Sequence, residues 1–103
     1  MHWRNQTGAV AEEIAILHFL RNGYFVFRPI LGFGPVDLVA LNADGEILLL
    51  DVKADNKRLN TGQRKTATRI TRKRTILQKF LGVRLCYVNL DEETVHVSDH
   101  EAN

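Results

Sequence analysis

The segment 34–54 constrains the fold more than any other part of the chain, because two apolar runs lie on either side of a short polar turn. Apolar runs that flank a turn ending in Gly45 predict a β-hairpin. A type I turn over residues 42–45, with Gly45 at positive φ, leaves a short loop and pairs Asn42 with Glu46. The hairpin therefore has a defined register.

That register brings three ionisable side chains to one end of the hairpin. Asp37 lies opposite Asp51, and Lys53 shares the face of Asp51 because side chains along a strand alternate. The other residues of both strands are apolar on both faces, which predicts a sheet buried on two sides. Ionisable groups in such a place hold a metal, pair with one another or take part in catalysis. For a D-x-K pattern taken alone, a structural ion pair between Asp51 and Lys53 is the more common explanation.

Three motifs together resemble the PD-(D/E)xK nuclease superfamily. The string P-V-D at residues 35–37 resembles its first element, although one residue separates the proline from the acid. The string D-V-K at residues 51–53 resembles the second element. The spacing G-x-x-x-E from Gly8 to Glu12 matches a pattern on the first helix of many members. The chain resembles the small Holliday-junction resolvases of archaeal type in size and motif order, and its segment 59–63 resembles the VRR-type endonucleases.

The resemblance implies an α/β fold with a restriction-endonuclease-like core. Its elements would follow the order α-β-β-β-α-β and form a mixed sheet of four to five strands flanked by helices. The 103 residues are expected to form one domain, with its core at residues 8–97 and an acidic tail at residues 98–103.

Helical periodicity and end signals predict two helices. The first covers residues 8–20, with Thr7 as its N-cap and Gly23 after its end. The second covers residues 66–81 and presents one apolar side to the sheet. Besides the hairpin, the expected strands are residues 24–28, 83–90 and 94–97.

Basic residues are concentrated in the segment 56–90, which has ten Lys and Arg and no Asp or Glu, although the net charge of the chain is only +2. Such a concentration indicates a polyanionic partner, with nucleic acid as the first candidate, and a solvated helix face is the alternative. The candidate nucleic-acid-binding residues are Arg28, Lys57, Arg58, Gln63, Arg64, Lys65, Arg69, Arg72 and Lys73. Gln63 belongs to a segment that resembles the VRR-type endonucleases, and a helix cap is its alternative role. Arg28 is equally a candidate for a surface ion pair.

The resemblance also implies a Mg²⁺ or Mn²⁺ site. Asp37, Asp51 and the carbonyl of Val52 would bind the metal, and Glu12 would complete the site directly or through water. Lys53 would orient the attacking water or stabilise the transition state. The implied catalytic residues are Glu12, Asp37, Asp51 and Lys53. For Glu12 the alternative is a favourable interaction with the helix N-terminus.

The function that follows is metal-dependent hydrolysis of DNA by a structure-selective endonuclease, acting as a homodimer by analogy with the Holliday-junction resolvases. Restriction, homing or nicking endonucleases would share every residue named. Two further hypotheses stay open, namely a catalytically silent DNA-binding module and a small structural protein with buried ion pairs.

Several other sites and locations are not indicated by the sequence. No histidine spacing suggests zinc, and no Gly-rich phosphate loop suggests a small-molecule cofactor. Cys86 is the only cysteine and is expected to be a core thiol. No stretch approaches the roughly 20 apolar residues of a membrane span, so an intracellular protein without a membrane partner is expected.

Overall fold

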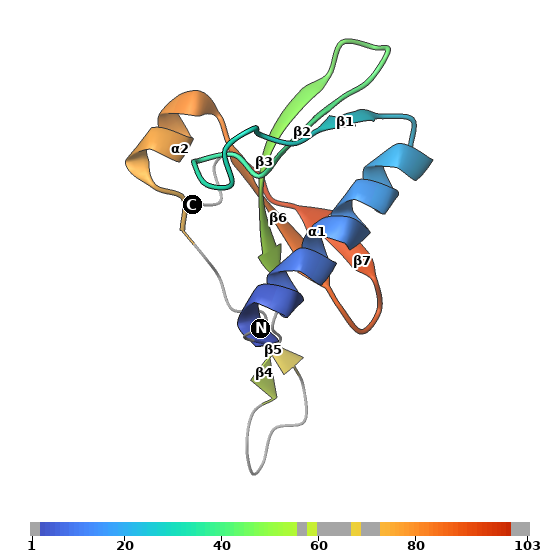
Figure 1. The fold of residues 1–103 in the computed structure, drawn as a ribbon, viewed down its shortest axis with the longest axis vertical. Coiled ribbons are helices and arrows are strands. Elements are labelled where there is room, and N and C mark those ends of the chain that lie inside the picture. Colours follow the sequence, from blue (N-terminus) through green and yellow to red (C-terminus); the bar gives the residue numbers. More distant parts are fainter. Residues whose placement is uncertain (1–2, 56–57, 60–66, 69–72, 100–103) are drawn as a thin grey trace.

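The computed structural model describes residues 3–55, 58–59, 67–68 and 73–99, and its centre is a mixed sheet (Figure 1). The sheet has five strands in the order β1-β2-β3-β6-β7. Only β3 and β6 are parallel, and the other neighbours are antiparallel. The strands are β1 (Phe25–Phe27), β2 (Leu38–Leu41), β3 (Ile47–Ala54), β6 (Arg84–Asn89) and β7 (Thr94–Val97). The predicted α/β fold class and the mixed sheet are confirmed.

The hairpin of β2 and β3 has the predicted register. The Asn42 N–H donates to the Glu46 carbonyl at 3.1 Å, and Gly45 has a φ of +88°. Leu38 lies opposite Leu50 in the ladder, so Asp37, one residue before β2, lies at the end of the hairpin beside Asp51. The side chain of Asn42 also accepts hydrogen bonds from the backbone of the turn, which fixes its conformation.

Helix α1 (Trp3–Arg21) crosses one face of the sheet (Figure 1). It begins at Trp3, so Thr7 lies within the helix and the prediction of Thr7 as its N-cap was wrong. Gly23 follows the helix with a φ of +84°, a conformation that glycine adopts readily, and it ends the helix as predicted. The α1 side of the sheet contains most of the core. The buried cluster there consists of Ala11, Ala15, Phe19, Leu38, Ala40, Leu48, Leu50, Cys86 and Val88.

The cysteine belongs to this core, as predicted. Burial raises the pKa of the Cys86 thiol to about 12, so it remains protonated at neutral pH.

The second predicted helix is much shorter than expected. Helix α2 (Ile76–Leu81) begins after Thr75, whose extended backbone and capping box with Gln78 fix the start of the helix. Farther upstream, the described residues form a two-stranded ribbon of β4 (Arg58–Leu59) and β5 (Ala67–Thr68) instead of helix.

The predicted apolar side of this helix does not cover the sheet. Ile76, Leu77, Phe80 and Leu81 are exposed, and Gln78 is the residue of α2 that is buried. Ile70, which the prediction also placed on the apolar side of this helix, lies outside the described residues. The prediction of a helix over residues 66–81 with an apolar, sheet-covering side was therefore wrong.

The sheet face opposite α1 is only partly covered. Phe25, Phe27 and Ile47 are exposed on this face near the β1 edge, whereas Leu85 and Tyr87 on β6 are buried. The prediction of burial on both faces was wrong at the β1 edge.

The first residues after β7 are attached to the sheet. Ser98 is buried, and its N–H donates to the Leu85 carbonyl at 2.9 Å. The Arg84 side chain donates to the Ser98 carbonyl at 2.8 Å and lies 3.8 Å from Asp99. The rest of the acidic tail lies outside the described residues. In the part of the chain that the structure describes, no helix has the length and apolar content needed to cross a membrane.

Candidate active site

The Asp37 carboxylate ends the ladder between β2 and β3. The Asp37 N–H donates to the Leu50 carbonyl at 2.7 Å, and its Oδ2 accepts the N–H of Val52 at 2.8 Å. If the antiparallel ladder continued, the Val52 N–H would pair with the backbone of the other strand. Here the Asp37 carboxylate accepts this N–H instead. Two backbone contacts therefore hold Asp37 against the middle of β3.

Asp51 is buried and has a different partner for each oxygen. Lys53 Nζ lies 3.5 Å from Asp51 Oδ1. The side-chain amide of Gln78 donates to Asp51 Oδ2 at 2.8 Å. The ion pair between Asp51 and Lys53 that the D-x-K pattern allows is present, and it lies next to a second acid.

Burial and the neighbouring Asp51 carboxyl both affect the pKa of Asp37. Its pKa is raised from 3.8 to about 6, mainly by burial and further by the Asp51 carboxyl and the charge of Glu12. The Val52 N–H acts in the opposite direction, because it stabilises the ionised form. Negative charge is therefore concentrated at this point, which would favour a cation.

The backbone of Val52 adds an oxygen to the same place. Its N–H points toward β2, where it binds Asp37. The N–H and C=O of one residue in a strand point to the same side, so the Val52 carbonyl also lies on the side of Asp37. Two carboxylates and a carbonyl are hard oxygen ligands of the kind that suits Mg²⁺ or Mn²⁺.

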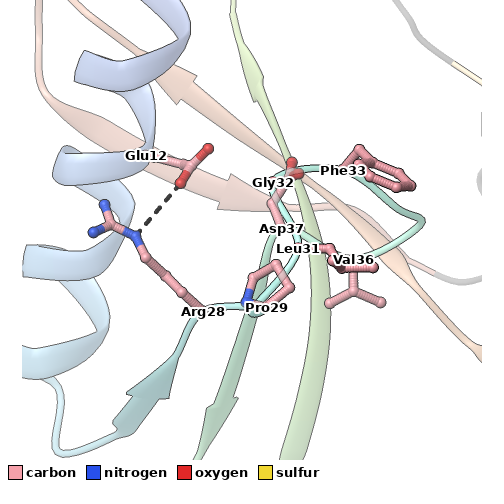
Figure 2. Close-up of a pocket in the computed structure, with 8 residues that line it drawn as sticks. All are labelled: Glu12, Arg28, Pro29, Leu31, Gly32, Phe33, Val36 and Asp37. Carbon is pink, nitrogen blue, oxygen red and sulfur yellow. Dashed lines mark ion pairs between the residues drawn. The ribbon is translucent and has the colours of Figure 1, made fainter.

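Glu12 borders the site from helix α1. It lines one pocket together with Asp37, Arg28 and the loop after β1 (Figure 2). Arg28 Nε lies 3.7 Å from Glu12, and Arg28 Nη2 lies 2.6 Å from Glu13. Among the described residues, no group of three or more His, Cys, Asp or Glu side chains is close enough to hold a metal ion. Glu12 therefore lies near Asp37 without forming a three-acid cluster with the two aspartates.

Gln78 is the residue of this site that the sequence reasoning missed. Its Nε2 contacts both Asp51 and the Pro35 carbonyl, the latter at 3.0 Å. Its Oε1 accepts the Thr75 N–H at 2.9 Å, and its own N–H donates to Thr75 Oγ1 at 3.1 Å. The spacing T-x-x-Q is a helix-start signal and would have located α2, but no sequence pattern indicates the contact with Asp51.

The predicted nucleic-acid-binding residues are only partly within the described chain. Lys73 is exposed and lies just before α2, and Arg28 is exposed at the end of β1. Arg58 lies in β4, and its side chain is not described. The remaining candidates, Lys57, Gln63, Arg64, Lys65, Arg69 and Arg72, lie outside the described residues.

Comparison with known proteins adds one likeness of fold. No family model and no curated protein match the chain. Among solved structures, the chain is similar to a bacterial homing endonuclease, I-Ssp6803I. The TM-score is 0.62, and the match covers 94% of this chain and 69% of that chain at 21% sequence identity. A likeness at this identity shows the fold alone, and it agrees with a restriction-endonuclease-like α/β domain.

Proposed function

We propose that this chain is a divalent-metal-dependent endonuclease that hydrolyses phosphodiester bonds in DNA. The observation that carries the proposal is the convergence of Asp37, Asp51 and Lys53 at the end of one hairpin, with Lys53 3.5 Å from Asp51 and the Asp37 pKa raised to about 6. Purely structural ion pairs do not require a second, half-buried acid beside the first. A perturbed acid at the edge of a pocket is typical of a functional site.

Asp37, Asp51 and the Val52 carbonyl would hold Mg²⁺ or Mn²⁺, and Glu12 would act through water. Such an ion makes bound water a better nucleophile at neutral pH and neutralises charge on the phosphoryl oxygens. The two carboxylates fit this role because they must otherwise remain close together with like charge.

Lys53 supplies positive charge beside the acids. Its ammonium can donate hydrogen bonds, and it would orient the attacking water or stabilise the negative charge that develops on the phosphate. Because Lys53 shares its face of β3 with Asp51, the rigid strand sets the distance between these two groups.

Gln78 and Arg28 act around this centre. The Gln78 amide holds Asp51 Oδ2 and so fixes the orientation of that carboxylate. Arg28 would move from its acidic partners to a phosphate when DNA binds, because a phosphate offers a stronger bidentate partner than a solvated carboxylate.

Two classes of DNA substrate suit the site. The resemblance to Holliday-junction resolvases favours a four-way junction cut by a homodimer. The fold likeness to a protein described as a homing endonuclease favours a linear duplex. Both hypotheses use the same residues, and the basic segment 56–90 would bind the phosphate backbone in either case.

The test is a cleavage assay on a labelled four-way junction, a linear duplex and a single strand of matched sequence, each with Mg²⁺, Mn²⁺ or EDTA. Asp51→Ala and Lys53→Ala are assayed beside the wild type. Asp44→Asn is the matched control, because it removes an exposed acid from the turn at the other end of the same hairpin.

Each outcome decides between these hypotheses. Metal-dependent cleavage that is lost in Asp51→Ala and Lys53→Ala and kept in Asp44→Asn supports the endonuclease. Symmetric cuts confined to the junction identify a resolvase, and light scattering then reports whether the protein is a dimer. Binding without cleavage under every metal would instead identify a DNA-binding module. No affinity for DNA and no thermal shift with either metal would leave only the structural role.

A further inference from the structure

The loop that joins β1 to β2 exposes large apolar side chains beside the acids. Ile30 is 102% exposed, Phe33 77% and Leu31 60%, relative to the same residues in a reference state. Pro29, Leu31, Gly32, Phe33 and Val36 line the same pocket as Glu12 and Asp37 (Figure 2). An apolar surface therefore borders the proposed active site.

The backbone of the loop presents Phe33 outward. Gly32 and Gly34 flank it, and Gly34 has a φ of +133°, which other residues rarely adopt. Figure 2 shows the Phe33 ring pointing away from Glu12 and Arg28. An exposed ring of this size forgoes the stabilisation that burial of such a side chain contributes, so the arrangement suits a protein with a bound partner.

The location of the loop beside Asp37 favours DNA as the partner. A protein seated on the loop would cover the pocket that contains Asp37 and would block the site from any substrate. A duplex with a phosphate at Asp37 and Asp51 instead passes directly beside the loop. Since base pairs are stacked about 3.4 Å apart along each strand, Phe33 would lie within a few base steps of that phosphate.

We propose that Phe33 is a wedge that inserts between adjacent bases next to the bond that is cut, unstacking that step and kinking the DNA, with Ile30 against the exposed groove. This inference rests on the proposed endonuclease function and adds the way in which the DNA is deformed. Phenylalanine and isoleucine are among the side chains that proteins insert between base steps, and such insertion bends the duplex. Base stacking on an aromatic ring is largely independent of sequence, which suits a domain too small to read a long site.

The experiment uses 2-aminopurine, whose fluorescence rises when it is unstacked. The full-length protein in Mg²⁺ first locates the cut in the preferred DNA. The probe is then placed in turn at each position within four steps of the cut, and the protein is added in EDTA so that the DNA stays intact. Phe33→Ala is compared with Phe25→Ala, which removes another exposed phenylalanine, one that lies on β1 and does not line the pocket.

A fluorescence increase at one step with wild type and Phe25→Ala, lost in Phe33→Ala, supports the wedge. We expect Phe33→Ala to bind this DNA about tenfold more weakly, the effect of removing one stacked aromatic ring. Phe33→Leu should keep part of the signal. An unchanged melting temperature in all variants shows that the change does not arise from unfolding, as expected for exposed side chains.

Failure of the wedge differs from failure of the proposed function. Cleavage that is equal in wild type and Phe33→Ala, with no fluorescence change at any step, overturns the wedge and leaves the endonuclease in place. Self-association that Phe33→Ala abolishes while DNA binding is unchanged also overturns it, and assigns the loop to a second copy. No binding and no cleavage of any DNA by wild type overturns both.

Discussion

The two faces of β3 are held in place in different ways. On the α1 side, Leu48 and Leu50 are buried among many apolar neighbours. On the other side, Asp51 and Lys53 depend on a few directional contacts, chiefly the 2.8 Å hydrogen bond from Gln78. Apolar packing tolerates small changes in geometry, whereas the orientation of a charged side chain depends on each of its hydrogen-bond and ion-pair partners. Substitutions on alternate residues of one strand should therefore separate stability from activity.

The largest effect is expected from Asp51→Asn. Loss of one carboxylate should reduce DNA cleavage by about 10³-fold, which corresponds to about 4 kcal/mol of transition-state stabilisation. The free energy of unfolding in EDTA should not fall, because the amide still accepts from Gln78 and no longer repels Asp37. Single-turnover cleavage and urea denaturation measure the two quantities. A large loss of stability would mean that Asp51 contributes to the stability of the fold. It would contradict the proposed difference between the two faces of β3.

Leu50→Ala should show the opposite pattern. Leu50 is fully buried beside Asp51 in sequence, and its truncation should lower the free energy of unfolding by about 3 kcal/mol. Cleavage per folded molecule should stay within a few-fold of wild type. The measurement is urea denaturation together with activity normalised to the folded fraction. Normal stability with lost cleavage would place Leu50 with the site rather than with the packing.

Gln78→Glu tests the directional contact itself. Glutamate also suits this capping-box position, so α2 should persist. The new carboxylate cannot donate a hydrogen bond to Asp51 and is repelled by the charge of Asp51. Cleavage should therefore fall by about 10–100-fold, which corresponds to about 1–3 kcal/mol of transition-state stabilisation.

Thr75→Ala is its matched control. It removes the cap at a cost of about 1 kcal/mol of stability and leaves the amide contact with Asp51 in place. If Thr75→Ala reduced cleavage as much as Gln78→Glu, the role of Gln78 would be limited to the helix start.

The smallest effect concerns pH. The pKa of Asp37 is raised to about 6 in the folded chain, so between pH 4 and 6 the folded state binds more protons than the unfolded state. The metal-free protein should therefore lose stability as pH rises through this range, by about 1 kcal/mol after screening by water, since Asp37 is only half-buried. Denaturation of wild type and Asp37→Asn at pH 4.5 and 7.0 in EDTA isolates this contribution. Equal slopes in both proteins would refute it.

Bound divalent metal should offset the loss of stability that the metal-free protein shows as the pH rises. At pH 7 the Asp37 carboxyl is above its pKa of about 6 and can bind Mg²⁺ or Mn²⁺ together with Asp51, so the metal should raise the melting temperature of wild type and not that of Asp37→Asn.

The sequence predicts well what local chemistry determines. The turn with Asn42 and Gly45 fixed the register of the hairpin and thereby the meeting of Asp37 and Asp51. The fold class was implied by the resemblance of three local motifs to the PD-(D/E)xK superfamily. Helix α2 was predicted too long because apolar spacing was given more weight than the start signal at Thr75.

Contacts between distant segments could not be predicted. The pairing of Arg28 with Glu12 and Glu13 depends on how α1 crosses β1, and the contact from Gln78 to Asp51 depends on where α2 lies against the sheet. Exposure of Phe33 depends likewise on the course of the loop after β1. Neither periodicity nor motif spacing contains this information.

The turn at residues 42–45 also has a kinetic consequence. Hairpins with such short connections close within about 1–10 μs, so Asp37 and Asp51 should become neighbours early in folding. The parallel pairing of β3 with β6 requires closure of the whole segment between them, which is slower. Gln78 lies in that segment, so we expect the chain to assemble its acids first and to add the amide that orients one of them last.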